Sequence, residues 1–403
     1  MSDLKLAWRN TLRNLRRTLL TALVIAVGLA ALIFVEGLIE GMKVNMIRSA
    51  TQTLQGEAQI HARGYREEPD VDLLIPLFEQ VSATLQNDPA IAAWSPRTLA
   101  QGMLASASGM GAVQIYGVEP EQEVQVSLFR RGLVSGVFLS GEKQEIILGK
   151  KLAEELEVSL GDRIVLTAAS SSKAGSGDLT QELFRVSGIF DLQSNTLNSV
   201  VALVNRSTLL GALRLGPGAH EIALRFKELN HPPSLKFENP EIEYLLWPEL
   251  MPALYAMLEM TNSSMLIMGF ILFGVISFGV VNSLLMSLYE RMYEFGVLKA
   301  VGTRPTRIAR LILLESLCLG MISIAIGTTL GLGLTLWFSR HGIQMPSTEY
   351  AGTVLRDPIF VISSRESFIR LPLFVLGLTL LAGVYPAWIA AHLNPSQAMR
   401  KSL

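Results

Sequence analysis

The side chains of this chain that could bind phosphate or a metal do not occur at the spacing that such chemistry requires. The nearest approach to a phosphate-binding loop is Gly149-Lys150-Lys151, but Gln144 replaces its first glycine and Lys151 replaces its hydroxyl residue. His220 and the glutamate after it begin like a zinc-protease motif, yet Leu224 occupies the position of the second histidine. We therefore expect no metal, cofactor or catalytic site in this chain.

The segment from Glu290 to Gly302 is instead typical of a helix that binds a protein partner. Its apolar residues recur at i, i+3 and i+6 beside charges of alternating sign, and Gly302 ahead of Pro305 predicts the end of the helix. Such a helix suits insertion into a groove of another protein. The alternative is a helix at the lipid surface, but Glu290 and Glu294 disfavour it because such helices have a basic polar face. The apolar stripe is Phe295, Leu298 and Val301.

The composition predicts a membrane protein. Of the 403 residues, 50% are apolar and only 17% are charged, against about 25% charged in soluble domains. Four charge-free runs, at residues 18–35, 261–289, 316–339 and 371–391, hold 18, 29, 24 and 21 residues. Each is long enough to cross a bilayer, which takes roughly 17–25 residues. Glu315 is the one acid well inside a hydrophobic stretch, and we expect it to snorkel or cap near a span end rather than to couple transport to an ion.

Basic residues predict the orientation of the four spans. They gather in the leader, in residues 290–310 and in the tail, which places these three stretches and both termini in the cytoplasm. Residues 43–260 carry 18 Lys and Arg against 26 Asp and Glu and should be extracytoplasmic. The first run could be a cleaved signal peptide, but its length and the lack of a small-residue cleavage site favour a retained anchor.

The large extracytoplasmic insert has mixed α+β patterns. We expect strands near Thr98–Ser106 and Ala112–Val118, and further strands and a helix between Glu145 and Phe226. Cys318 is the single cysteine, so a disulfide scaffold is excluded. A net charge of −1 disfavours binding of nucleic acid.

These patterns divide the chain into nine parts. They are a basic amphipathic cytoplasmic leader (1–17), the first span with a stalk (18–42), a periplasmic α+β domain (43–260), the second span (261–289), a cytoplasmic coupling helix and loop (290–310), the third span (311–339), a periplasmic loop (340–370), the fourth span (371–391) and a cytoplasmic tail (392–403).

Three segments resemble the FtsX-like, MacB-type family of ABC transporter permeases. They are ERMYEFGVLKAVG from Glu290, YPAWIAAHLNPSQAMR from Tyr385, and EIILGKKLAEELEVSLGDRIVL from Glu145 with FRVSGIF after it. The order of parts is also similar to that family, and within it the chain looks most like the lipoprotein-releasing (LolC/LolE) branch. The resemblance covers most of the chain, and its most specific motifs lie in the last third.

This resemblance implies a non-catalytic permease of the bacterial inner membrane that works by mechanotransmission. A separate ABC ATPase dimer would bind ATP and Mg²⁺, and its closure would be relayed to the periplasmic domains of two permease chains, identical or paralogous. The residues of the coupling helix would be Glu290, Arg291, Glu294, Phe295, Gly296, Leu298, Lys299 and Gly302.

Lipoprotein or another amphipathic cargo would enter from the membrane lipid between the first two spans. The expected lining is Ile33, Phe34, Leu38, Met42, Met265, Phe270 and Phe273. Gly37 with Gly41, and Gly327 with Gly331, have the G-x-x-x-G spacing of close helix contacts and are candidates for packing between the two chains.

Two other functions stay open within the family. One is a MacB-like efflux permease for peptides or drugs, although an ATPase is normally fused to such chains. The other is an FtsX-like relay to a cell-wall hydrolase, whose periplasmic domain is usually smaller than this one.

Overall fold

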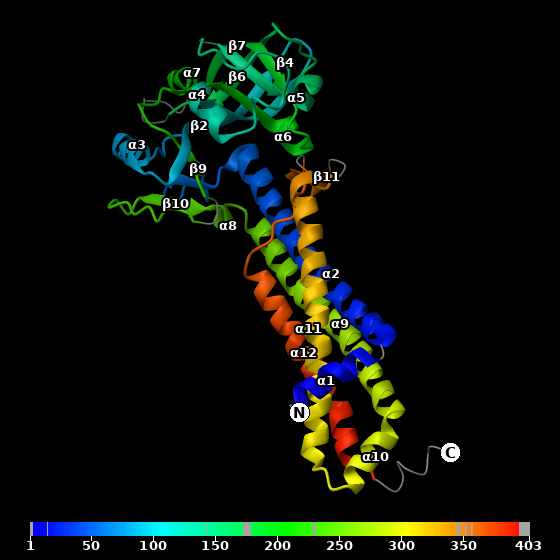
Figure 1. The fold of residues 1–403 in the computed structure, drawn as a ribbon. Helices are drawn as coiled ribbons and strands as arrows, with labels where there is room; N and C mark the ends of the chain where they lie inside the picture. Colours follow the sequence, from blue (N-terminus) through cyan, green and yellow to red (C-terminus); the bar gives the residue numbers. More distant parts are fainter. Residues whose placement is uncertain are drawn as a thin grey trace. The chain divides into compact units, whose positions relative to one another are not determined.

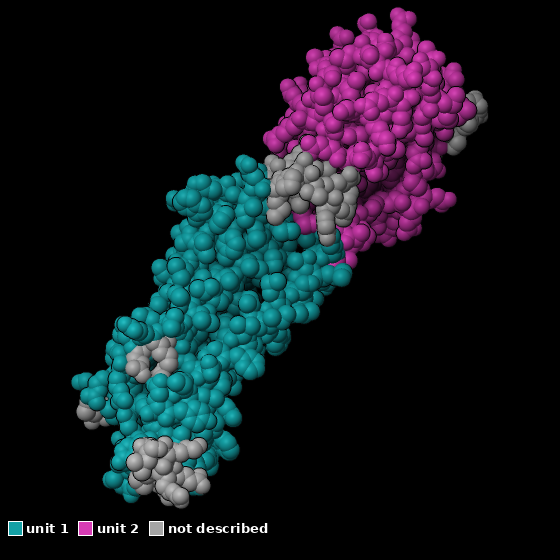
Figure 2. Space-filling model, turned by 90° about the vertical axis from the view of Figure 1, so that its right-hand side faces the viewer, with its two compact units in different colours: residues 1–44, 257–344, 357–403 teal, residues 45–256, 345–356 magenta. Residues whose placement is uncertain are grey.

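The computed structural model describes residues 3–13, 15–142, 144–171, 179–228, 231–344, 348–350, 353–355 and 358–394. The expected tail therefore lies largely outside the described residues, and the loop at 340–370 lies partly outside them. The chain forms two compact units, shown in teal and magenta in Figure 2. The helical unit contains residues 1–44, 257–344 and 357–403, and the strand-rich unit contains residues 45–256 and 345–356.

Long apolar helices build the helical unit. The described helices that belong to it wholly or in large part are α1 (Asp3–Arg13), α2 (Leu15–Ala50), α9 (Pro252–Glu290), α10 (Met292–Ala300), α11 (Pro305–His341) and α12 (Ser367–His392). Four of them, α2, α9, α11 and α12, are long and apolar enough to cross a membrane, which confirms the four spans expected from the sequence. These four run alongside one another (Figure 1).

A shared apolar core holds the four long helices together. It includes Ile25 and Leu29 from α2, Ile276 from α9, Leu319 from α11 and Val375 from α12. Cys318 is also buried in α11.

Gly327 and Gly331 pack α11 against α2 of the same chain. A Cβ atom at Gly327 would lie 2.7 Å from the carbonyl oxygen of Ala26, and one at Gly331 would lie 3.1 Å from Ile33. The prediction that these glycines pack against a second chain is therefore wrong, because both are buried where two helices of one chain approach closely.

Gly37 and Gly41 are also covered by their own chain. A Cβ atom at Gly37 would lie 2.8 Å from Val361, and one at Gly41 would overlap the carbonyl oxygen of Phe360. The backbone N–H of Ile362 donates to the carbonyl oxygen of Gly37 at 3.0 Å. The segment at 359–362 thus occupies the small-residue face of α2 at which a second chain was predicted.

We expect Gly327→Val to destabilise the helical unit by about 1–3 kcal/mol, because the added side chain forces α2 and α11 apart. Gly333→Val is the matched control, since a Cβ atom there meets nothing within 4 Å. Thermal unfolding in detergent checks both variants. Equal melting temperatures for the two would show that close contact at Gly327 is unimportant.

The strand-rich unit is built around one mixed sheet of ten strands among the described residues. The strands are β1 (Ala58–Ala62), β2 (Ile91–Ala105), β3 (Met110–Val118), β4 (Leu133–Gly136), β5 (Glu145–Gly149), β6 (Arg163–Ala169), β7 (Leu179–Phe190), β8 (Val201–Asn205), β9 (Glu221–Phe226) and β10 (Ile242–Leu246). Short helices connect them: α3 (Phe78–Asn87), α4 (Pro120–Val126), α5 (Lys150–Glu155), α6 (Asn195–Val200), α7 (Arg206–Ala212) and α8 (Trp247–Leu250). A π-helical turn at Thr51–Gln55 precedes β1.

The pairing of β6 closes part of this sheet into a ring. The order along the sheet is β10-β1-β9-β2-β3-β8-β5-β7-β4, and β6 pairs with both β2 and β7. Strands β2, β3, β8, β5, β7 and β6 therefore form a closed circuit, and all six contribute to one buried apolar cluster. Leu104, Ile115, Leu148, Leu166 and Phe184 are among its members. The α+β class expected from the sequence is confirmed.

Candidate functional site

Helix α10 is the main candidate site, and its C-terminal end is well defined. Gly302 has φ +95°, which glycine adopts without steric cost. The N–H of Thr303 donates to the carbonyl oxygen of Leu298, and that of Gly302 donates to Lys299, both at 3.0 Å. These two bonds form a Schellman cap, so Gly302 ends the helix as its position in the sequence predicts.

Phe295 is buried inside the helical unit and is only 1% exposed. It belongs to a cluster with Leu288, Ile308, Ile312 and Ala390 from α9, α11 and α12. The expectation that Phe295 lies on one exposed stripe with Leu298 and Val301 is therefore wrong. The other two are exposed at 41% and 82%, so Phe295 anchors α10 and leaves a different face open.

The exposed apolar face of α10 follows the spacing i, i+4, i+8. Tyr293 and Val297 are exposed together with Val301, and Leu298 lies at the edge of this face. We call Tyr293, Val297, Leu298 and Val301 the α10 ridge. Tyr293 and Val297 could not be singled out from the sequence, since choosing between two apolar stripes requires knowing which one the bundle buries. Gly296 is buried on the opposite side.

Charged residues tie α10 to α1 and α11. Arg291 donates from Nη1 to Oε1 of Glu315 at 2.7 Å and from Nε to Oε2 of Glu294 at 3.0 Å. Asn10 donates to the same Glu315 oxygen at 2.8 Å, and Arg13 donates to Glu294 at 3.0 Å. Glu315 is 7% exposed, so it neither snorkels nor caps as expected but forms the buried end of a network across three helices.

Lys299 joins α10 to the end of α12. Its Nζ donates to the carbonyl oxygens of Ala391 and Leu393 at 2.7 and 2.8 Å. Carbonyls in the last turn of a helix lack intrahelical partners, and a lysine satisfies them while facing the negative end of the helix dipole. Of the predicted coupling residues, Arg291, Glu294 and Lys299 thus bind other parts of the same chain, and Leu298 is exposed. Glu290 is exposed as well.

The seven predicted cargo-lining residues differ in how far they are exposed. Ile33 is 1% exposed and packs on Gly331, and the ring of Phe34 lies 5.2 Å from that of Phe338. Phe270 is 71% exposed on α9, while Leu38, Met42, Met265 and Phe273 are half-buried. The expected position of Ile33 is therefore wrong, because it faces the bundle core.

A groove between α2 and α9 has a different lining. Its volume is about 280 Å³, and it is lined by Leu20, Thr21, Val24, Gly279, Asn282, Ser283 and Met286. Thr21 donates to Ser283 at 2.8 Å across it.

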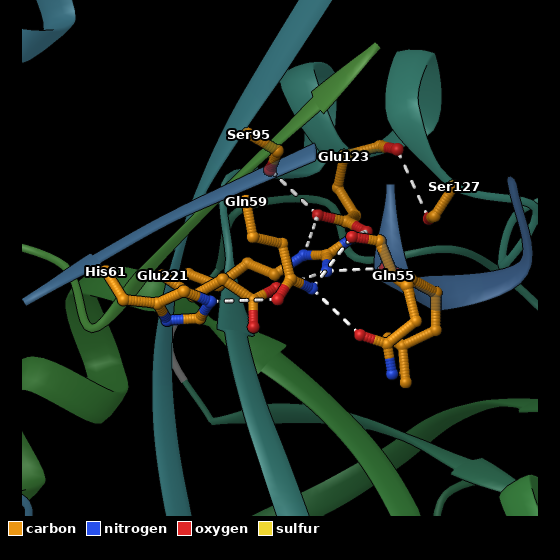
Figure 3. Close-up of polar contacts among 9 residues, drawn as sticks. Gln55, Gln59, His61, Ser95, Glu123, Ser127 and Glu221 are labelled. Atoms are coloured by element: carbon orange, nitrogen blue, oxygen red, sulfur yellow. Dashed lines mark hydrogen bonds and ion pairs between the residues drawn. The ribbon is translucent and has the colours of Figure 1, made fainter. Parts of the chain in front are cut away.

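The strand-rich unit has a buried polar network centred on Arg97, which is 0% exposed. Figure 3 shows its labelled members Ser95, Glu123 and Glu221. Arg97 donates to both oxygens of Glu123, at 3.0 and 2.7 Å, and to Glu221 and the carbonyl of Leu54 at 2.7 and 2.6 Å. Ser95 donates to Glu123 at 2.8 Å. The network joins β2, α4 and β9.

The pKa values of the two carboxyls in this network shift in opposite directions. Burial alone would raise the pKa of Glu123, but the bidentate Arg97 guanidinium lowers it below its usual 4.5. Burial raises the pKa of Glu221 above 4.5, and its single bond from Arg97 offsets this only in part. Glu123 is therefore the ionised partner of Arg97, and Glu221 is the carboxyl that takes up a proton more readily.

This difference predicts opposite pH dependence for two matched variants. A raised pKa in the folded state stabilises the fold below pH 4.5 and loses that contribution as pH rises through the folded pKa. Glu221→Gln should therefore cost more at low pH than at neutral pH. For Glu123 the pKa is lowered, so Glu123→Gln should cost more at neutral pH and less as pH falls through its folded pKa. Chemical denaturation at several pH values measures both, and equal trends would contradict the assignment.

Comparison with known proteins identifies the class of this chain. Residues 18–238 match the family described as the MacB-like periplasmic core domain, and residues 266–395 match the FtsX-like permease C-terminal family. With its four apolar helices, the chain is a multi-pass membrane permease.

The first of these matches spans more than half of the sequence, so the chain belongs to the FtsX-like, MacB-type family of ABC transporter permeases. Such permeases work with an ABC ATPase.

Named relatives cover nearly the whole chain. The lipoprotein-releasing system transmembrane protein LolC of Xylella fastidiosa is 24% identical over 393 residues, which are 93% of this chain and 92% of that protein. The corresponding LolE of Haemophilus influenzae is 24% identical over 335 residues, 80% of each chain. Among solved structures, the periplasmic region of MacB from Actinobacillus actinomycetemcomitans aligns with a TM-score of 0.36 and 14% identity, over 53% of this chain and 98% of that one.

Proposed function

We propose that this chain is the permease subunit of a complex that releases lipoproteins, or similarly lipidated cargo, from the bacterial inner membrane. The observation that carries this proposal is the similarity to LolC over 93% of the chain, with both segments of the family present. Both termini and α10 lie in the cytoplasm in this proposal, and the strand-rich unit lies in the periplasm. The chain itself performs no catalysis and binds no cofactor, since ATP and Mg²⁺ belong to the partner ATPase.

The α10 ridge supports mechanotransmission from that ATPase. Its four apolar residues form an uncovered face on a short helix, and a groove in a protein partner would bury them. The polar side of α10 is fixed to α1, α11 and α12 through Arg291, Glu294 and Lys299. A push on the ridge is therefore delivered to several helices of the bundle.

The open face of α9 supports assembly with a second permease chain and entry of cargo from the lipid. Only 11% of the most apolar window of α9 is buried, against 44% for α11. Asn282 is exposed on α9 beside the α2–α9 groove. A polar side chain facing lipid is unfavourable, and a hydrogen bond to a neighbouring helix relieves it. A second permease chain at this face supplies such a helix.

Purification of the complex from native membranes tests this proposal, with mass spectrometry of the copurifying proteins. We expect an ABC ATPase, a second permease chain and acylated proteins. A periplasmic adaptor in place of acylated proteins would favour efflux, and a hydrolase activator would favour the cell-wall relay. Recovery without any ATPase would overturn the proposal.

A further inference from the structure

Helix α1 presents three parallel rows of side chains, each with the spacing i, i+4, i+8. The first row packs on the bundle through buried side chains, namely Ala7 and Thr11, with Asp3 half-buried beside them. The second row is apolar and 40–52% exposed, and it contains Leu4, Trp8 and Leu12. The third row is basic and exposed, and it contains Lys5, Arg9 and Arg13. The described chain thus covers one row of α1 and leaves an apolar row and a basic row open beside each other.

Contacts with α11 place α1 at one end of the membrane spans. Arg307 donates to Asp3 at 3.2 Å, and Asn10 donates to Glu315 at 2.8 Å. Both contacts lie just before the charge-free run of α11, which begins at residue 316, and α1 itself ends shortly before the charge-free run at 18–35. In Figure 1, α1 crosses α11 toward the same end of the bundle as α10. Helix α1 therefore lies where two spans leave the hydrocarbon.

The apolar row of α1 suits the boundary between acyl chains and headgroups. Tryptophan is enriched at this boundary, because its ring is largely apolar and carries one polar N–H group. Trp8 lies between Leu4 and Leu12 on the open side of the helix. A helix with such a row beside a basic one lies in the plane of the membrane surface, with the apolar row among the upper parts of the acyl chains.

The charges of α1 favour an anionic surface. Asp3 is the only acid of the helix, and it is bonded to Arg307. Arg13 pairs with Glu294 at 3.0 Å, whereas Lys5 and Arg9 have no ion-pair partner among the described residues. Each Lys or Arg near an anionic membrane surface strengthens the attraction to it about fivefold. The two unpaired cations therefore match the phosphates of anionic lipids.

We propose that α1 binds anionic phospholipid, with Leu4, Trp8 and Leu12 among the acyl chains and with Lys5 and Arg9 on the headgroup phosphates. A groove in a partner protein fits this helix less well, because its two open rows carry no acid, whereas α10 carries Glu290 and Glu294. The site is separate from the α10 ridge and from the α2–α9 groove. It depends neither on the transported cargo nor on the ATPase.

Fluorescence of Trp8 in the full chain, reconstituted in nanodiscs, tests the proposal. All discs contain phosphatidylcholine with 30 mol % phosphatidylglycerol, and bromine, which quenches tryptophan on contact, is carried either by the phosphatidylglycerol or by an equal amount of the phosphatidylcholine. The signal of Trp8 is the difference between each protein and its Trp8→Phe version. Random lipid contact gives equal quenching in the two sets of discs, so we expect brominated phosphatidylglycerol to quench about twofold more strongly.

The double variant Lys5→Gln with Arg9→Gln should keep the quenching but lose the preference for phosphatidylglycerol, because the apolar row stays and the unpaired charges go. Arg130→Gln with Arg131→Gln is the matched control, since it removes two exposed charges from the strand-rich unit. It should keep the preference, and thermal unfolding should confirm that both variants fold.

Three results would overturn the proposal. Absence of quenching by either brominated lipid would show that protein, such as a second copy of the chain, covers the apolar row. Equal quenching by the two lipids in the unchanged protein would show lipid contact without recognition of the headgroup. A preference that survives in the Lys5 and Arg9 variant, or that is lost equally in the control, would show that these two cations do not bind the phosphates.

Discussion

Replacing Arg97 by methionine should destabilise the strand-rich unit by about 3–5 kcal/mol, because removing one partner leaves buried charge uncompensated. Glu123 and Glu221 are both buried and share this one guanidinium. The carbonyl of Leu54 would also lose its donor. The three contacts link β2 to α4, β9 and the turn before β1, so the loss should weaken several elements at once.

Chemical denaturation of the full chain, followed by hydrogen exchange of the β2 and β9 amides, measures this loss. Arg225→Met on β9 is the matched control, since Arg225 is exposed and donates to the backbone carbonyl oxygen of Gln125. We expect a change below about 1 kcal/mol there. Arg97→Lys should rescue only partly, because an ammonium cannot make the bidentate contact to Glu123. Equal stability of Arg97→Met and Arg225→Met would contradict a central role for the network.

Changing Leu298 and Val301 together to aspartate should abolish ATP-driven release while leaving membrane insertion intact. Both side chains are exposed, so the fold tolerates the charges, whereas an apolar groove in the ATPase would not. Proteoliposomes that contain the ATPase and an acylated protein provide the measurement. We expect release to fall below about a tenth of its original rate, as it does when anchors at the centre of an interface are lost.

Leu160→Asp in the strand-rich unit is the control for the added charge, since Leu160 is 45% exposed, close to the 41% of Leu298. Phe295→Asp is unsuitable as a docking variant, because a charge buried among Ile308, Ile312 and Ala390 would disrupt the bundle itself. Unchanged release by the double variant would show that the α10 ridge is not the docking surface.

The sequence predicts the spans well because hydrocarbon requires long uninterrupted apolar runs. It also predicts the strands whose buried residues alternate or run together, such as β3 at Met110–Val118 and β6 at Arg163–Ala169. It missed β1, whose sequence AQIHA carries Gln59 and His61 at buried positions. Polar residues at buried positions interrupt the apolar pattern from which a strand is predicted, and their partners come from elsewhere in the chain.

The same reason explains why parts of the candidate site could not be predicted from the sequence. Arg97 contacts Glu123 and Glu221, which lie 26 and 124 positions later in the sequence. The spacing of neighbouring residues cannot predict contacts over such separations. For α10, periodicity shows that apolar faces exist but not which one the bundle buries, so Phe295 was assigned to the wrong face. For the four glycines, the spacing correctly indicates close packing but leaves the identity of the neighbour open.

The ammonium of Lys299 also couples any displacement of α10 to α12. Its two bonds end on carbonyls at the end of α12, and hydrogen bonds to charged groups contribute about 1.5–3 kcal/mol each. A small thermal displacement of α10 therefore drags α12 along, and only a stroke strong enough to break both bonds lets the two helices part.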